Sequence, residues 1–209
     1  MVGMSSTPVP SPSSARPPRP LRVVAVSGTL STPSKTDALV HEIVTALGDV
    51  LPIEAHVIRV SELGPLFAGA LTRDQLDERV ERELVAIETA DLLIAASPVY
   101  RASFTGLFKH FFDFIHQDAL IDKPVLLAAT GGSERHALVI DHQLRPLFSF
   151  FQARTLPLGV YATDRDFLDY RVHNEALAER ARLAVQRALP LIALTRPAGA
   201  IAAENVAAA

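Results

Sequence analysis

A short segment between residues 27 and 36 gathers the side chains best suited to binding an anion. It follows a buried apolar run and holds six hydroxyl side chains and one lysine, at Ser27, Thr29, Ser31, Thr32, Ser34, Lys35 and Thr36. Hydroxyl groups, backbone N–H groups and the positive end of a helix dipole together suit a phosphate. This segment, called loop one below, lacks the Walker A spacing and the G-x-G-x-x-G of dinucleotide-binding Rossmann domains. A terminal monophosphate therefore fits it better, and the alternative is a Ser/Thr-rich turn that only caps a helix.

A second segment, residues 97–106 (S-P-V-Y-R-A-S-F-T-G), follows another buried run and is called loop three. Pro98 fixes its own φ at the point where the chain leaves the strand, so the next backbone groups are held rigidly. Tyr100 could lie against a flat ligand, and Arg101 could face an anion. The alternative is a strand-to-helix turn with incidental polar residues.

A third segment, residues 130–136 (T-G-G-S-E-R-H), is called loop four. Its Gly131–Gly132 pair permits close approach of the backbone to a ligand, or simply a tight turn. Ser133 is expected to cap a helix, and His136 is expected at the surface rather than in catalysis. We find no Ser-His-Asp, Cys-His or paired-carboxylate constellation, so no catalytic residue and no metal site is predicted.

The three loops together indicate one ligand with a phosphate and a large planar ring. Loop one suits the phosphate, while loops three and four offer rigid backbone amides and an aromatic side chain. Flavin mononucleotide (FMN) matches that description.

The elements that must position these loops alternate along the chain. Short apolar runs predict five strands, and stripes of apolar residues at helical spacing predict a helix after each of them. The strands are expected at residues 21–27, 53–60, 91–97, 123–130 and 155–163, and the helices around residues 39–47, 76–87, 104–115, 140–151 and 177–188. This pattern predicts an α/β fold, a doubly wound parallel sheet of five strands with helices on both faces. Ligands of such sheets bind at the carboxyl ends of the strands.

Composition excludes several other classes of protein. The 209 residues are 49% hydrophobic and 21% charged, with a net charge of −3 and no cysteine. No thiolate nucleophile, disulfide or Cys-ligated metal is available, and there is no electrostatic reason to bind nucleic acid or an anionic membrane. No apolar run approaches the ~20 residues of a membrane span, and no secretory signal precedes the first strand, so a cytoplasmic protein is expected.

The ends of the chain differ from its middle. Residues 1–20 hold six of the 15 prolines and many serines, which predicts a disordered tail. Residues 196–209 are expected to be a weakly ordered second tail, which leaves residues 21–195 as one domain.

At this point the chain is identified as similar to a known family. Loop three closely matches the P-V-Y-(K/R)-A-S-F segment of the flavodoxin-like NAD(P)H-dependent FMN reductases, and A-T-G-G-S-E-R-H at residues 129–136 resembles their A-T-G-G-S-x-x-H segment. The nearest resemblance is to the reductase components of two-component alkanesulfonate and methanesulfonate monooxygenases. In loop one, Ser31 occupies the family's arginine position, so the positive charge near the phosphate must come from Lys35.

The resemblance implies a set of FMN-binding residues. The phosphate would be held by Thr29, Ser34, Lys35 and Thr36. The isoalloxazine would be lined by Pro98, Val99, Tyr100, Arg101, Ala102 and Ser103, and its other edge closed by Thr130, Gly131, Gly132 and Ser133. Arg101 is also expected to contact the nicotinamide nucleotide. In some relatives an inserted tyrosine creates a π-bulge near the flavin; His142 stands there in this chain, which favours the methanesulfonate-type branch.

Aromatic residues point to an assembly. Eight of the ten phenylalanines fall on the two segments 104–115 and 140–151, and they cannot all share one core-facing stripe. A homodimer or homotetramer is therefore expected, in line with the family's dimer-of-dimers habit. The alternative is a thick core rich in phenylalanine.

The expected activity is transfer of hydride from NADH or NADPH to FMN, followed by release of reduced FMN to a partner monooxygenase, for sulfonate desulfonation. Such chemistry belongs to the cofactors and needs no protein nucleophile. One alternative is a quinone, azo-dye or metal-ion reductase that keeps FMN bound. A flavodoxin-type electron carrier is less consistent with a chain that has no Trp, three Tyr and a charge of −3. A flavin-free signalling module would leave loop one without a purpose.

Overall fold

The computed structural model describes residues 19–194. The two expected tails lie outside the described residues, except for Arg19 and Pro20. No helix within residues 19–194 is long and apolar enough to cross a membrane.

A parallel sheet with the strand order β2-β1-β3-β4-β5 forms the centre of the molecule. Its members are β1 (Leu21–Ser27), β2 (Ile53–Arg59), β3 (Leu92–Pro98), β4 (Pro124–Gly131) and β5 (Arg154–Thr155), while β6 (Val160–Thr163) also pairs with β4. The order reverses between β1 and β3, which is where ligands of doubly wound sheets bind. The predicted α/β architecture is confirmed.

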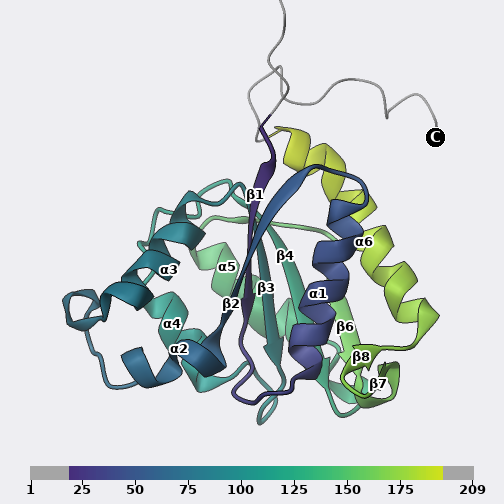
Figure 1. Ribbon diagram of the computed structural model, residues 1–209, viewed down its shortest axis with the longest axis horizontal. Helices are drawn as coiled ribbons and strands as arrows, with labels where there is room; N and C mark the ends of the chain where they lie inside the picture. The colour runs from purple at the N-terminus through teal and green to yellow at the C-terminus, as the bar shows by residue number, and fades with distance from the viewer. Residues whose placement is uncertain (1–18, 195–209) are drawn as a thin grey trace, which may run out of the picture.

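Helices cover both faces of this sheet (Figure 1). One face packs against α1 (Lys35–Gly48) and α6 (Glu175–Leu194), and the other against α2 (Val60–Phe67), α3 (Glu78–Thr89), α4 (Gly106–Asp113) and α5 (Arg145–Phe150). Alternate strand residues serve the two faces, because successive side chains of a strand point in opposite directions. In β1, Val24 and Val26 join the α3–α4 side, whereas Val23 and Ala25 join the α1–α6 side.

Most of the phenylalanines form the core on the α3–α4 side. Of the eight on the segments 104–115 and 140–151, six have less than a tenth of their surface exposed: Phe108, Phe111, Phe112, Phe114, Phe148 and Phe151. Phe112 and Phe148 meet edge to face, with ring centroids 5.1 Å apart, so α4 and α5 are joined by aromatic packing. The alternative of a thick phenylalanine core therefore describes these six, whereas Phe150 is 68% exposed.

The expected fifth strand, residues 155–163, is interrupted. Pro157 has no N–H to give to a sheet ladder, and a Cβ on Gly159 would lie 2.7 Å from Ile140. The chain therefore leaves β4 after Thr155 and pairs with it again from Val160.

Three further features were not predicted from the sequence: two elements, and the π-helical form of the first part of the predicted helix 140–151. Helix α2 contains Gly64 and Pro65, which hide its periodicity. A π-helix spans Ile140–Leu144 and includes the exposed His142, so the chain is π-helical here without the tyrosine of some relatives. The third is a hairpin of β7 (Phe167–Leu168) and β8 (Arg171–Val172), which lies beside α1 (Figure 1).

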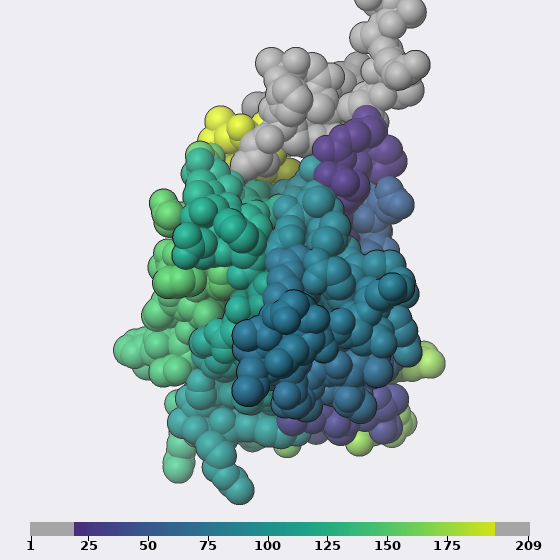
Figure 2. Space-filling model, turned by 90° about the vertical axis from the view of Figure 1, so that its left-hand side faces the viewer, coloured from purple at the N-terminus to yellow at the C-terminus, as the bar shows by residue number. Residues whose placement is uncertain are grey.

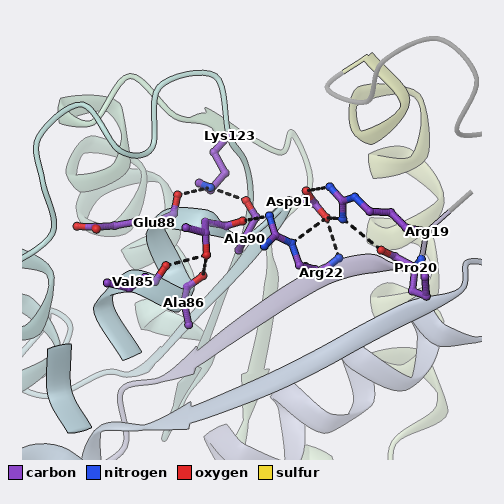
Figure 3. Close-up of polar contacts among 10 residues, drawn as sticks. Arg19, Pro20, Arg22, Val85, Ala86, Glu88, Ala90, Asp91 and Lys123 are labelled. Atoms are coloured by element: carbon purple, nitrogen blue, oxygen red, sulfur yellow. Dashed lines mark hydrogen bonds and ion pairs between the residues drawn. The ribbon is translucent and has the colours of Figure 1, made fainter. Parts of the chain in front are cut away.

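A polar cluster around Asp91 closes the amino-end edge of the sheet (Figure 3). Arg19 donates to both carboxylate oxygens at 2.6 and 2.8 Å, and the backbone N–H of Arg22 donates at 2.8 Å. Burial alone would raise the pKa of Asp91, but these hydrogen bonds outweigh burial and lower it. The cluster anchors the start of β3, at the end of the sheet opposite loops one, three and four.

Candidate functional site

The carboxyl ends of β1, β3 and β4 surround a cavity of about 280 Å³. It is lined by Thr29, Ser31, Pro33, Ser34, Lys35, Thr36, Pro98, Val99, Tyr100, Thr130, Gly131, Gly132, Asp164 and Tyr170. Ten of the fourteen residues expected to bind FMN are in this set. The other four, Arg101, Ala102, Ser103 and Ser133, lie outside the lining. Loop three projects as a teal turn from the lower edge of the molecule in Figure 2.

Loop one meets the amino end of α1 through Ser34. This residue is the N-cap, and its hydroxyl accepts hydrogen bonds from the N–H groups of Thr36 at 3.1 Å and Asp37 at 3.3 Å. Within residues 19–194, no acceptor faces the N–H groups of Ser34 and Lys35. Free N–H groups at the positive end of a helix dipole attract an anion. Ser34 therefore caps the helix, as the alternative interpretation of loop one expected, and the open N–H groups leave donors for an anion.

Two contacts tie the beginning of α1 to strands across the cavity. The hydroxyls of Thr36 and Thr130 lie 2.7 Å apart, both buried. The ammonium group of Lys35 lies 2.8 Å from Oδ1 of Asp164, the first residue after β6. Lys35 was expected to supply the positive charge near the phosphate, and in the structure this charge is already paired with the carboxylate of Asp164.

Loop three contains a strained two-residue turn. Tyr100 and Ser103 exchange backbone hydrogen bonds of 2.8 and 3.2 Å, and the residues between them, Arg101 and Ala102, have φ of 52° and 69°. Turns of this shape favour glycine and asparagine, because a Cβ in the left-handed region costs roughly 1–2 kcal/mol per residue. The turn leaves Tyr100 47% exposed beside the cavity, where a flat ligand could lie against its ring.

Cross-links between the loops fix their relative positions. The hydroxyl of Thr105 donates to the carbonyl of Gly28 at 2.8 Å, joining loop three to loop one. The N–H of Val99 donates to the carbonyl of Thr130 at 2.8 Å, joining loop three to loop four. Gly28 must lack a side chain, because a Cβ there would lie 2.6 Å from the ring of Phe108. The cavity walls are therefore preorganised.

Loop four is held from behind by Tyr161 of β6. Its hydroxyl donates to the carbonyl of Ser133 at 2.6 Å, and burial raises the pKa of this phenol. A Cβ on Gly131 would lie 2.2 Å from the same hydroxyl, which is why glycine is required there. Ser133 stands at the N-cap position of a short 3₁₀ turn but its side chain makes no capping hydrogen bond, contrary to expectation.

The lining residues Asp164 and Tyr170 were missed by the sequence analysis. Asp164 follows β6, and Tyr170 lies at the tip of the β7–β8 hairpin with φ of 57°. Tyr170, Pro33 and Ser34 also border a neighbouring groove of about 580 Å³. Strands of two residues carry no periodicity, so no sequence signal marked this hairpin.

The residues present fit FMN. Loop one offers hydroxyls and open N–H groups to a phosphate, and the half-exposed Tyr100 lines the same cavity as Gly131 and Gly132. A Cβ on Gly132 would meet only Asp164, at 3.9 Å, so the backbone is accessible at that point. The volume is near the lower end of the ~300–1,000 Å³ typical of ligand pockets, which suits a ligand that stays partly exposed.

Comparison with solved structures identifies the fold of the chain. A WrbA-like flavodoxin from Agrobacterium tumefaciens superposes with a TM-score of 0.58 at 17% identity, covering 85% of this chain and all of that one. The fold is therefore flavodoxin-like. An oxidoreductase from Corynebacterium diphtheriae superposes with a TM-score of 0.75 at 35% identity, covering 84% of this chain and 98% of that chain.

Sequence comparison then gives the family. Residues 21–167 match the model of the NADPH-dependent FMN reductase family. The NADH-dependent FMN reductase SfnF of Pseudomonas fluorescens is 59% identical over 83% of this chain and 92% of its own length. An FMN reductase (NADPH) of Pseudomonas aeruginosa is 55% identical over 82% of this chain and 92% of its own length. The chain belongs to the NADPH-dependent FMN reductase family, and it is an oxidoreductase that uses FMN and NAD(P)H.

Proposed function

We propose that this FMN reductase binds FMN in the cavity at the ends of β1, β3 and β4 and releases it, once reduced, to a partner monooxygenase. The observation that carries the proposal is the convergence of ten expected FMN-binding residues on one cavity with a partly open wall. We assign the partner to sulfonate desulfonation, on the resemblance of loops three and four to the reductases of those systems. The reaction is assigned to the cytoplasm, where reduced nicotinamide is formed.

Each loop has a separate task in this proposal. The N–H groups of Ser34 and Lys35 and the hydroxyls of Thr29 and Thr36 hold the phosphate. The turn at Tyr100 and the Gly131–Gly132 backbone hold the ring at its two edges. Bound FMN would supply the hydride acceptor, and the protein would hold the flavin ring in the orientation that hydride transfer requires.

Arg101 is assigned to the nicotinamide nucleotide rather than to the cavity. Its left-handed turn lies outside the lining, so its guanidinium can serve a second anionic ligand that approaches from solvent. Either NADH or NADPH is the reductant, in line with the relatives that are described with one or the other.

We further propose that the protein acts as a homodimer or homotetramer that joins through the α4–α5 face. Phe150 is exposed there beside an apolar groove of about 380 Å³, which Phe112, Ile115, Leu147 and Phe151 also line. Exposed aromatic surface of this kind is typical of interfaces.

The test is steady-state oxidation of NADH and NADPH under air, with free FMN titrated from zero. A releasable-flavin reductase gives almost no activity without FMN and saturates as FMN is added. A protein that purifies yellow and reduces quinones or dyes without response to added FMN would instead be an FMN-bound quinone or azo reductase. This second candidate function is supported by a relative at 29% identity, which is described as an FMN-dependent NADPH-azoreductase of Staphylococcus saprophyticus.

A further inference from the structure

We infer that Asp164 weakens FMN binding by competing with the flavin phosphate for Lys35, so that reduced flavin can leave. The inference rests on the proposed function and deepens it, because it assigns flavin release to one residue. It makes Asp164 a specificity-determining residue that acts on phosphorylated flavins and not on the ring.

The charged side chains that line the cavity neutralise each other. Lys35 and Asp164 are the two charged side chains of the lining, and they form an ion pair of 2.8 Å. The lining therefore has no net charge, although a phosphate monoester brings a charge of about −1.5 to −2 at neutral pH. Loop one has Ser31 where the family pattern has an arginine, and Ser31 cannot replace that charge. A phosphate entering this cavity meets a lysine that is already partnered.

Asp164 lies on a well-anchored stretch of backbone beside the cavity. Its backbone neighbours are fixed: Thr163 and Asp166 are buried, and the carboxylate of Asp166 accepts from the N–H of Thr163 at 2.6 Å and its hydroxyl at 2.8 Å. The backbone that carries Asp164 is therefore held beside the cavity. The carboxylate of Asp164 also approaches loop four, since a Cβ on Gly132 would lie 3.9 Å from Oδ2.

The ion pair between Lys35 and Asp164 is exposed to solvent. The side chains of Lys35 and Asp164 are 33% and 64% exposed. Ion pairs that are this exposed to solvent contribute little free energy. The ammonium group of Lys35 can therefore move toward a phosphate at a small cost in free energy. The carboxylate then stands close to a second anion, and this repulsion lowers the affinity for FMN.

The test compares FMN with riboflavin, which has the same ring and no phosphate. Dissociation constants and dissociation rates of both flavins are measured by fluorescence quenching and stopped flow on the wild-type protein and on Asp164→Asn. We expect Asp164→Asn to bind FMN about tenfold more tightly, mostly through slower dissociation, and to bind riboflavin as before. The difference should shrink at high salt, since both groups are solvent-exposed.

Two further variants sharpen the result. Asp122→Asn makes the same chemical change in another exposed ion pair, with Arg154 near the start of β4, and should leave both flavins unaffected. In a Lys35→Ala background, Asp164→Asn should improve FMN binding by less than tenfold, because the competition for the lysine is gone.

The outcomes separate this inference from the function. If wild-type protein neither binds nor reduces FMN, the proposed function is wrong. If it binds FMN and Asp164→Asn leaves the affinity unchanged, or alters riboflavin by the same factor, the function stands and the role of Asp164 is overturned.

Discussion

Ser34 performs two tasks that can be separated by experiment. Its hydroxyl caps α1, and its own N–H, which has no hydrogen-bond partner within residues 19–194, is proposed to bind the phosphate. Asp77 caps α3 in a similar way, accepting from the N–H of Arg79 at 2.8 Å, but lies outside the lining of the cavity. The two caps therefore form a matched pair.

We predict that Ser34→Ala and Asp77→Ala each lower the free energy of unfolding by about 1 kcal/mol. Only Ser34→Ala should also raise the dissociation constant for FMN, by about tenfold, because the first turn of α1, whose N–H groups are proposed to hold the phosphate, loses its cap. Urea unfolding and flavin fluorescence measure the two effects. Equal loss of FMN affinity in both variants would place the phosphate elsewhere.

Ala102 stores backbone strain in loop three. Its φ of 69° suits glycine, so Ala102→Gly should raise the free energy of unfolding by roughly 1 kcal/mol. The looser turn should raise the KM for FMN, because strain held at a site helps to preorganise it. Ala86→Gly in the middle of α3 makes the same change at helical φ and should have the opposite effect on stability, a loss of roughly 1 kcal/mol. A lower free energy of unfolding in Ala102→Gly than in the wild type would show that the backbone at Ala102 is not strained.

At the scale of elements, the β7–β8 hairpin depends on Asp166. This buried carboxylate accepts from the N–H and hydroxyl of Thr163 and from the side-chain amide of Asn174 at 2.6 Å. Burial would raise the pKa of Asp166, but these hydrogen bonds, with the charge of Arg165, outweigh burial and lower it. A lowered pKa contributes stability that is present above the unfolded value, about 3.9, and is lost as the pH falls through the folded value.

Asp166→Asn should therefore destabilise the protein by about 2–3 kcal/mol near pH 7, since it weakens charge-assisted hydrogen bonds. The gap between the variant and the wild type should close as the pH falls below about 4. Chemical unfolding at a series of pH values measures it. A gap that stays constant down to pH 2.5 would show that the charge of Asp166 has no role.

The same scale explains what the sequence could and could not predict. Strands β1, β3 and β4 were predicted within one residue of their ends, because their apolar patterns are nearly continuous and their loops carry strong turn residues. Helix α1 begins four residues before the predicted stripe 39–47, because its first turn, residues 35–38, is mostly polar. The break after Thr155 was missed because it depends on the close approach of Ile140 to Gly159, and the hairpin was missed because strands of two residues carry no periodicity. The site followed the same rule: lining residues in the loops after β1, β3 and β4 were predicted, whereas Asp164 and Tyr170 come from segments without a motif.

At the scale of the whole molecule, one exposed aromatic residue tests the proposed assembly. Phe150 lies at the end of α5, with its ring 5.2 Å from that of Phe151. We predict that Phe150→Glu lowers the mass measured by analytical ultracentrifugation, because a charge at a buried interface is costly. Leu183→Glu, on the exposed side of α6, is the control and should leave the mass unchanged. Identical masses for wild type and Phe150→Glu would move the interface elsewhere or remove it.

The most direct test of the account is a crystal structure of the protein with FMN. We predict the phosphate at the amino end of α1, within hydrogen-bond distance of the N–H groups of Ser34 and Lys35. The isoalloxazine should lie between the turn at Tyr100 and the backbone of Gly131 and Gly132. Flavin bound outside this cavity, or a phosphate away from α1, would contradict the central claim.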